Sequence, residues 1–158
     1  MQGTILSTRV DSVEYIRLVG VIRYSHCAGL EAHIVKIFAE PDFSEIAIDL
    51  ELAEMLDSTA LGLLARISIE YKKISDKKPV IFLQKGELAH ILKRVCFDQV
   101  FNILEKSQTA DLSSFVELES VSKSEEEVLD CVIEAHRNLA EISESNERYF
   151  TDITKALS

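Results

Sequence analysis

The chain has 158 residues, of which 47% are hydrophobic, and its 17 basic and 27 acidic side chains give a net charge of −10. This length predicts one domain with an appendage, and the hydrophobic content is sufficient for a full core. Phosphate contacts require clustered Lys and Arg, so the acidic balance argues against nucleic-acid binding. The sequence shows neither an apolar run long enough for a membrane span nor a signal-peptide pattern. We therefore expect a cytoplasmic protein without membrane contact.

The first 116 residues alternate between β-prone runs and amphipathic segments, the pattern of an α/β layer structure with a mixed sheet covered by helices. A short connection is expected between the third strand and the second helix. We expect strands at 4–10, 13–19, 46–50, 80–83 and 100–104, and helices at 29–39, 58–74, 87–95 and 109–115.

Acidic charge is concentrated at the C-terminal end of the chain. Residues 117–158 carry 4 basic and 11 acidic side chains, against 13 and 16 in residues 1–116. Ser124, followed by three glutamates, predicts the start of a helix. Beyond it, seam residues follow the 4-3 alternation typical of a coiled coil. They are Val128, Val132, Ala135, Leu139, Ile142, Asn146, Tyr149, Ile153 and Ala156.

This spacing predicts one long helix over residues 124–156, and it leaves two alternatives for the apolar stripe. In the first, the helix mediates association, as a homo-oligomer or with a partner's helix, and Asn146 fixes the register and partner number. In the second, the helix packs on its own domain through a broader stripe that includes Leu129, Ile133 and Phe150. A bare apolar stripe of this length is unstable in water, so one of the two must hold.

The clearest candidate site is Asp57-Ser58-Thr59, at the expected start of a helix. Backbone N–H groups are unpaired there and the helix dipole favours negative charge. Such a position can hold a serine hydroxyl and, after modification, a phosphate. The alternative is a simple N-terminal cap, because all three residue types are favoured at caps. Gly62, inside the helix, indicates a close contact, since Gly costs about 1 kcal/mol there relative to Ala.

This segment resembles the signature of STAS domains, the fold of bacterial anti-sigma factor antagonists. In that family a strand leads to Asp-Ser-(Ser/Thr)-x-Leu-Gly, and the serine after the aspartate is phosphorylated. Asp57, Ser58, Thr59, Leu61 and Gly62 match this pattern, and Ser58 would be the phosphoacceptor. The resemblance implies a STAS domain over 1–118. It does not explain residues 119–158, which we expect to form an acidic C-terminal helical extension that is either coiled-coil-like or packed on the core.

The resemblance also implies a function in partner switching. The five matched residues would bind an anti-sigma factor, itself a serine kinase, while Ser58 is unphosphorylated. Phosphorylation would release this partner, and a PP2C-type phosphatase would restore binding. The alternatives are a non-switching STAS scaffold and a small-ligand-binding STAS domain. The sequence departs from the family at Arg23, where many phosphorylatable members carry an acidic residue.

Motifs for catalysis or metal binding are not found in the sequence. The four histidines are scattered, and the three cysteines are far apart, which favours structural histidines and reduced thiols. Neither a glycine-rich phosphate loop nor a G-x-S-x-G elbow is present. We therefore expect a binding module with no catalytic residues, metal or cofactor.

Overall fold

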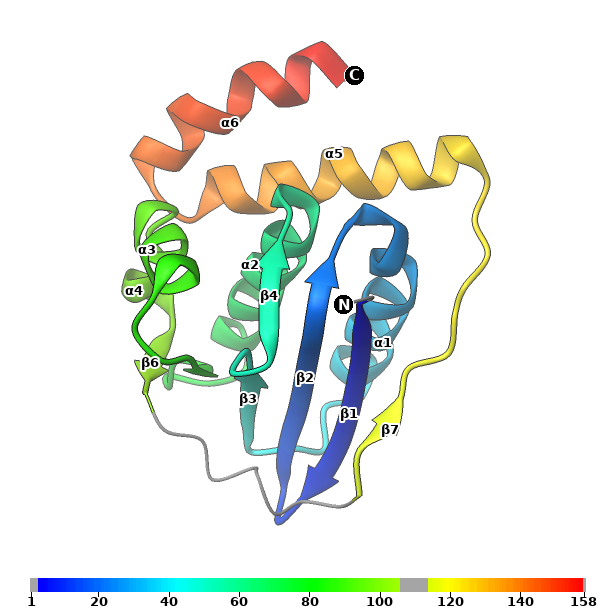
Figure 1. Ribbon diagram of the computed structural model, residues 1–158, viewed down its shortest axis with the longest axis vertical. Helices are drawn as coiled ribbons and strands as arrows, with labels where there is room; N and C mark the ends of the chain where they lie inside the picture. Colours follow the sequence, from blue (N-terminus) through cyan, green and yellow to red (C-terminus); the bar gives the residue numbers. More distant parts are fainter. Residues whose placement is uncertain (1–2, 106–113, 158) are drawn as a thin grey trace.

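A computed structural model describes residues 3–105 and 114–157, without the side chains of residues 152–154. It contains a seven-stranded mixed sheet in the order β6-β5-β3-β2-β1-β7, with β4 beside β2 (Figure 1). The strands are β1 Thr4–Val10, β2 Val13–Ile22, β3 Glu45–Asp49, β4 Ala53–Leu56, β5 Val80–Phe82, β6 Asn102–Leu104 and β7 Val116–Glu117. The helices are the 3₁₀ turn η1 Tyr24–His26, α1 Cys27–Ala39, α2 Ser58–Lys72, α3 Glu87–Arg94, α4 Phe97–Val100, α5 Glu125–Glu141 and α6 Glu144–Leu157.

Antiparallel and parallel pairing meet at the centre of the sheet. β1 and β2 form an antiparallel hairpin, and its turn places Asp11 and Ser12 at positive φ. β2, β3, β5 and β6 pair in parallel, as βα crossovers require. The predicted α/β fold with a mixed sheet is confirmed.

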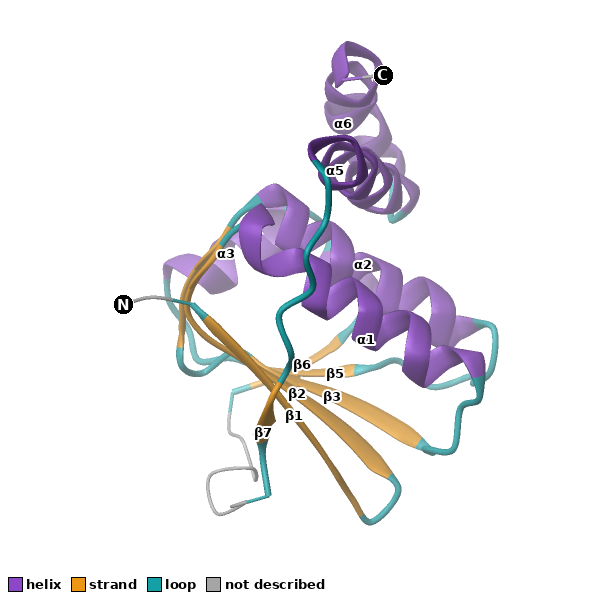
Figure 2. Ribbon diagram, turned by 90° about the vertical axis from the view of Figure 1, so that its right-hand side faces the viewer, coloured by secondary structure: helices purple, strands orange, loops and turns teal. Residues whose placement is uncertain are grey.

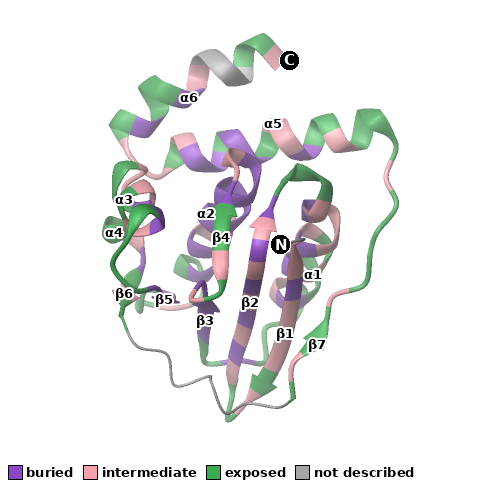
Figure 3. Cartoon of the chain, in the orientation of Figure 1, coloured by how far each residue is buried: buried purple, intermediate pink, exposed green. Residues whose placement is uncertain are grey.

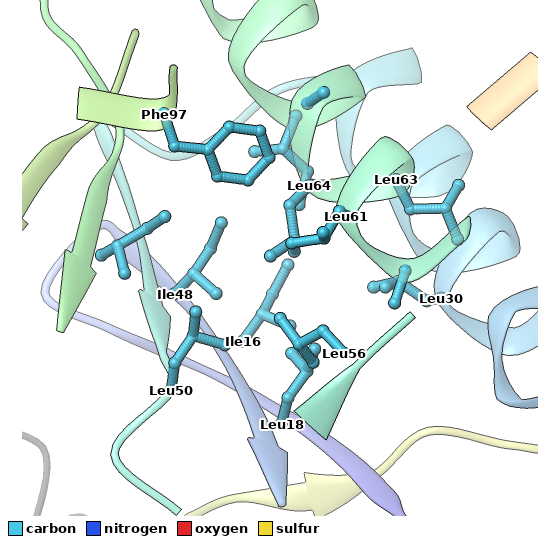
Figure 4. Close-up of a cluster of buried hydrophobic side chains, with 14 of the residues drawn as sticks. Ile16, Leu18, Leu30, Ile48, Leu50, Leu56, Leu61, Leu63, Leu64 and Phe97 are labelled. Carbon is cyan, nitrogen blue, oxygen red and sulfur yellow. The ribbon is translucent and has the colours of Figure 1, made fainter. Parts of the chain in front are cut away.

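The elements form three layers (Figure 2). α1 and α2 lie on one face of the sheet, and α5 and α6 lie on the outer side of these two helices. Alternate residues of β2 are buried, because every second side chain points toward the helix layer. The main core lies between the sheet and the first helix layer and includes Ile16, Ile48, Leu61 and Phe97 (Figure 4).

Helix α2 is buried on nearly all sides. Residues 59–65 are all buried, whereas a surface helix would expose every third or fourth position. The sheet covers one side of α2 and α5 covers the other (Figures 2 and 3). The start of α2, where the candidate site lies, is therefore an internal position between two layers.

Three expectations for residues 1–116 differ from the structure. The connection between β3 and α2 contains β4, which pairs in parallel with the end of β2 across a register shift at Gly20 and Val21. Val100 ends the turn α4, so the strand expected at 100–104 begins at Asn102. The helix expected at 109–115 lies outside the described residues up to 113, and Ser114 and Phe115 are not helical.

The prediction of one continuous helix over 124–156 is wrong, because α5 ends at Glu141 and α6 begins at Glu144. Ser143 causes the break: its hydroxyl accepts a hydrogen bond from the Asn146 amide at 3.1 Å, capping a new helix. The predicted start at Ser124 is confirmed, since Ser124 and Glu127 form a reciprocal capping box. Of the two arrangements left open by the sequence, the structure shows packing on the chain's own core.

Candidate functional site

Asp57 is the N-cap residue that fixes the start of α2. Its Oδ1 accepts a hydrogen bond from the Ala60 amide at 2.9 Å, which satisfies one of the unpaired N–H groups of the first turn. Its Oδ2 accepts a second from the Tyr24 amide at 2.7 Å, and its own amide donates to Ile22. Asp57 thus ties the start of α2 to the connection between β2 and α1, and this fixes the position of Ser58.

The Ser58 hydroxyl faces a histidine of α5. Its Oγ lies 2.8 Å from Nε2 of His136, and Nδ1 of the same ring lies 2.6 Å from the Val132 carbonyl oxygen. A carbonyl oxygen only accepts, so in the neutral ring Nδ1 carries the proton and Nε2 accepts from Ser58. His136 is 4% exposed and Ser58 is half-buried. The candidate phosphoacceptor is therefore engaged by a buried side chain of the same molecule.

Gly62 lies one helical turn after Ser58, where α5 crosses α2. A Cβ at position 62 would lie 2.1 Å from the Ala135 carbonyl oxygen and 2.6 Å from the Ala135 Cβ. Only glycine allows this approach of the two backbones. The close contact predicted at Gly62 is present, but it is made by the backbone of the chain's own helix α5 and not, as expected, by a neighbouring strand or a partner's backbone. The remaining residues of the signature, Thr59 and Leu61, are both buried.

Two large apolar side chains flank the site on the surface. Tyr24, beside Asp57 in the connection between β2 and α1, is 56% exposed, and Met55 on β4 is 52% exposed. Arg23, which follows the last residue of β2, is also exposed.

A polar cluster holds the beginning of α5 against α1 and α2. Glu31 of α1 accepts a hydrogen bond from Lys123, and Arg66 of α2 lies 3.9 Å from the same carboxylate. Burial opposes ionisation of Glu31, but hydrogen bonds from Lys123 and Cys131 outweigh it and lower the pKa of Glu31. The hydrogen bond between Lys123 and Glu31 also raises the pKa of Lys123. Burial raises the pKa of the Cys131 thiol to about 12, so this thiol stays protonated.

The residues proposed as an association seam are divided between the two tail helices. Leu139 is fully buried, while Val128, Val132 and Ile142 are half-buried. The side-chain amide of Asn146 donates hydrogen bonds from Nδ2 to the backbone oxygens of Val95 and Leu139 at 2.7 and 3.0 Å, so its partners belong to the same chain. The side chain of the seam residue Ile153 lies outside the described part.

Other potentially reactive groups have structural partners. His33 contacts the buried Glu14 carboxylate at 3.0 Å, and Cys27, Cys96 and Cys131 are free thiols. Across residues 3–105 and 114–157, His, Cys, Asp and Glu side chains form no group of three or more suited to a metal ion. In the same ranges, the helices are too short or too polar to cross a membrane.

Comparison with known proteins identifies the family. The family model of the STAS domain matches residues 5–110, so the chain belongs to the STAS domain family. The fold is similar to that of the anti-sigma factor antagonist SpoIIAA in its unphosphorylated form, with 14% identity and a TM-score of 0.55 over 68% of this chain and 91% of that one. It is also similar to an anti-sigma factor antagonist from Mycobacterium paratuberculosis, with 22% identity and a TM-score of 0.56 over 66% and 87%. A search of curated proteins finds no match.

The tail lies beyond the matched family region, and it contributes the residue that sequence reasoning missed. His136 interrupts the broad apolar stripe of α5, between Val132 and Leu139. A titratable side chain on a buried helix face needs a polar partner. The position of His136 in the apolar stripe was therefore a signal in the sequence that this residue has such a partner. The partner, Ser58, is 78 residues away in sequence and could be found only from the fold.

Proposed function

We propose that this protein is an anti-sigma factor antagonist of a partner-switching pathway, with Ser58 as its phosphorylation switch. The observation that carries the proposal is the capped start of α2, where Asp57 fixes the first turn and presents the Ser58 hydroxyl inside a STAS fold. The two structural neighbours, both anti-sigma factor antagonists, support this choice. The flanking Tyr24 and Met55 supply the exposed apolar area that a protein partner would cover.

In this proposal an anti-sigma factor with serine kinase activity binds when Ser58 is unphosphorylated. Phosphorylation adds about −1.5 to −2 charges at the contact. The start of α2 stabilises that charge in the free protein, because its dipole is positive there. The partner surface pressed against the new charge is desolvated and repelled, and the complex dissociates. A PP2C-type phosphatase then removes the phosphate and restores binding.

Phosphopeptide mapping of the chain isolated from cells tests this function. We expect phosphate on Ser58 and none on Thr59, because the Thr59 side chain is buried. The Ser58→Ala chain should carry no phosphate in the same peptide. An unphosphorylated Ser58 in every growth condition would contradict the proposal.

One observation favours a second candidate, a STAS scaffold without a switch. The Ser58 hydroxyl already has a partner in His136, and α5 covers the adjacent turn of α2. In a scaffold this contact would be permanent and purely structural. The two candidates therefore differ in whether α5 leaves α2.

A further inference from the structure

The C-terminal helix α5 occupies a defined surface of α2 and α1. Ser58 and Gly62 of α2, with Glu31 and Arg66 beside them, form what we call the α5 seat. The opposing residues on α5 are adjacent: Ala135 fits against Gly62, and His136 accepts from Ser58. A hydrogen bond and a backbone contact that only glycine allows thus lie within one turn of each other. The seat fits one kind of ligand, a helix with a small residue at the crossing point.

We infer that the α5 seat is a helix-binding surface and that α5 is its internal ligand, which competes with a helix of the partner protein. The partner helix would carry a small residue against Gly62 and a hydrogen-bond acceptor against Ser58, as α5 does. The inference rests on the proposed function in taking Ser58 as the residue through which the partner is regulated. It adds that α5 must leave the seat before a kinase or a partner reaches Ser58.

A phosphoryl group that replaced the Ser58 hydroxyl hydrogen along its present hydrogen bond would overlap the His136 ring, because Nε2 lies 2.8 Å from Oγ. In the inferred mechanism, phosphorylation removes the hydrogen bond to His136 and thereby weakens the docking of α5. By linkage, docked α5 disfavours phosphorylation by the same factor by which phosphorylation disfavours docking.

The contacts of α5 suit reversible docking. Its N-terminal end is held by polar groups, chiefly Glu31 with Lys123 and Cys131. Asn138, one turn after Ala135, is 8% exposed, and its Nδ2 has no hydrogen-bond partner among the described residues. A buried amide without a partner makes the docked state less stable than a fully satisfied interface would be. Residues 119–122 have no regular secondary structure and lie between the Leu118 amide, which donates to Ile5, and Lys123, so they can act as the hinge of α5 when the contact of Lys123 with Glu31 opens.

A thiol-accessibility experiment tests whether α5 covers Ser58. In the full chain, Ser58→Cys is combined with Cys96→Ser, which removes the partly exposed native thiol. The other two thiols, Cys27 and Cys131, are buried, so labelling reports on residue 58. We expect 5,5′-dithiobis-(2-nitrobenzoate) to label residue 58 at least a hundredfold more slowly than in urea-unfolded chain. Ala135→Leu, which forces bulk against Gly62, should raise the rate at least tenfold. Glu134→Leu places the same leucine side chain on the exposed face of α5, away from Gly62, and should change nothing. A folded Ala135→Leu chain labelled as slowly as the parent would overturn the inference.

A peptide experiment tests whether the seat binds helices. A fluorescent peptide copying residues 124–142 should bind the Ala135→Leu chain at least tenfold more tightly than the wild-type chain, whose own α5 competes for the seat. The same peptide carrying Ala135→Leu should bind neither chain. Equal binding of both peptides would contradict a seat shaped around Gly62.

Hydrogen exchange of the wild-type chain decides the matter even if Ala135→Leu fails to fold. Amides of α5 should exchange at least tenfold faster than those of β2 and β3, because α5 opens without unfolding of the core. Equal exchange would mean that α5 opens only on global unfolding, and the inference would be wrong. None of these measurements involves a kinase or an anti-sigma factor. A failed competitor model and a failed partner switch are therefore distinguishable.

Discussion

The Ser58 hydroxyl donates a hydrogen bond of 2.8 Å to Nε2 of His136, a residue 78 positions further along the chain. This contact joins the family signature to a tail that extends beyond the matched STAS region. Because the Val132 carbonyl fixes the proton on Nδ1, the ring presents an acceptor to the serine. The candidate phosphoacceptor is therefore also one of the residues that contact the C-terminal tail.

A double-mutant cycle on Ser58→Ala and His136→Ala should reveal their coupling. We expect an interaction free energy of about 1 kcal/mol, because either single change removes the hydrogen bond and the second then removes nothing further. Urea unfolding followed by circular dichroism measures the four chains. Ser58→Ala combined with Lys155→Ala, an exposed change on α6, is the control and should be additive within about 0.5 kcal/mol. Additivity in the first cycle would show that the two side chains do not interact in solution.

Gly62→Ala should disturb the crossing of α2 and α5. The new methyl would lie 2.1 Å from the Ala135 carbonyl oxygen, so α5 must shift or leave. Overpacking of this kind costs about 1–3 kcal/mol, which exceeds the gain of about 1 kcal/mol in helix propensity. Gly86→Ala is the matched control, since a Cβ there meets nothing within 4 Å. Equal melting temperatures for the two variants would contradict the close approach.

The anchoring of α5 should weaken in acid. The pKa of Glu31 is lowered from its usual 4.5, so the ionised carboxylate stabilises the folded chain above that pH. The contribution fades as the pH falls through the lowered pKa and Glu31 becomes protonated. The difference in unfolding free energy between wild type and Glu31→Gln should thus be large at pH 7 and shrink below pH 4.5. Glu105→Gln, in an exposed pair with Lys85, should differ little from wild type throughout. A constant Glu31→Gln difference across this range would contradict the account.

The full chain should sediment as a monomer. Leu139 is fully buried and the Asn146 amide is used internally, so these two seam positions are not free for a second molecule. Removal of residues 120–158 uncovers the α5 seat and should lower the melting temperature. A stable dimer of the full chain that is lost on truncation would restore the intermolecular reading of the seam.

Local signals in the sequence predicted β1, β2, β3, β5 and β6 and the helices α1, α2 and α3, because periodicity and caps act over a few residues. β4 was missed because Glu54 and Met55 are exposed in succession and Leu56 alone is buried, so the strand lacks the alternating pattern of a half-buried one. The tail was misread because a 4-3 alternation continues across residues 142–143, although Ser143 caps a new helix there. The run at 59–65 contains no charged side chain, and this was a sign in the sequence that α2 is covered on both sides. The sequence pattern of α2 does not show that α5 covers its second side. That contact joins residues far apart in the sequence, and periodicity gives information only about neighbouring residues.

The central claim, that the charge state of Ser58 decides partner binding, is tested most directly by two baits in one cell extract. Ser58→Ala and Ser58→Asp chains are immobilised at equal amounts, and the retained proteins are quantified by mass spectrometry. The account predicts that an anti-sigma factor with a serine kinase domain is retained at least tenfold more by Ser58→Ala, a difference of about 1.4 kcal/mol. Purified partner and full-length baits should reproduce this ratio. Equal retention by the two baits would contradict the phosphorylation switch at Ser58 and favour the STAS scaffold without a switch.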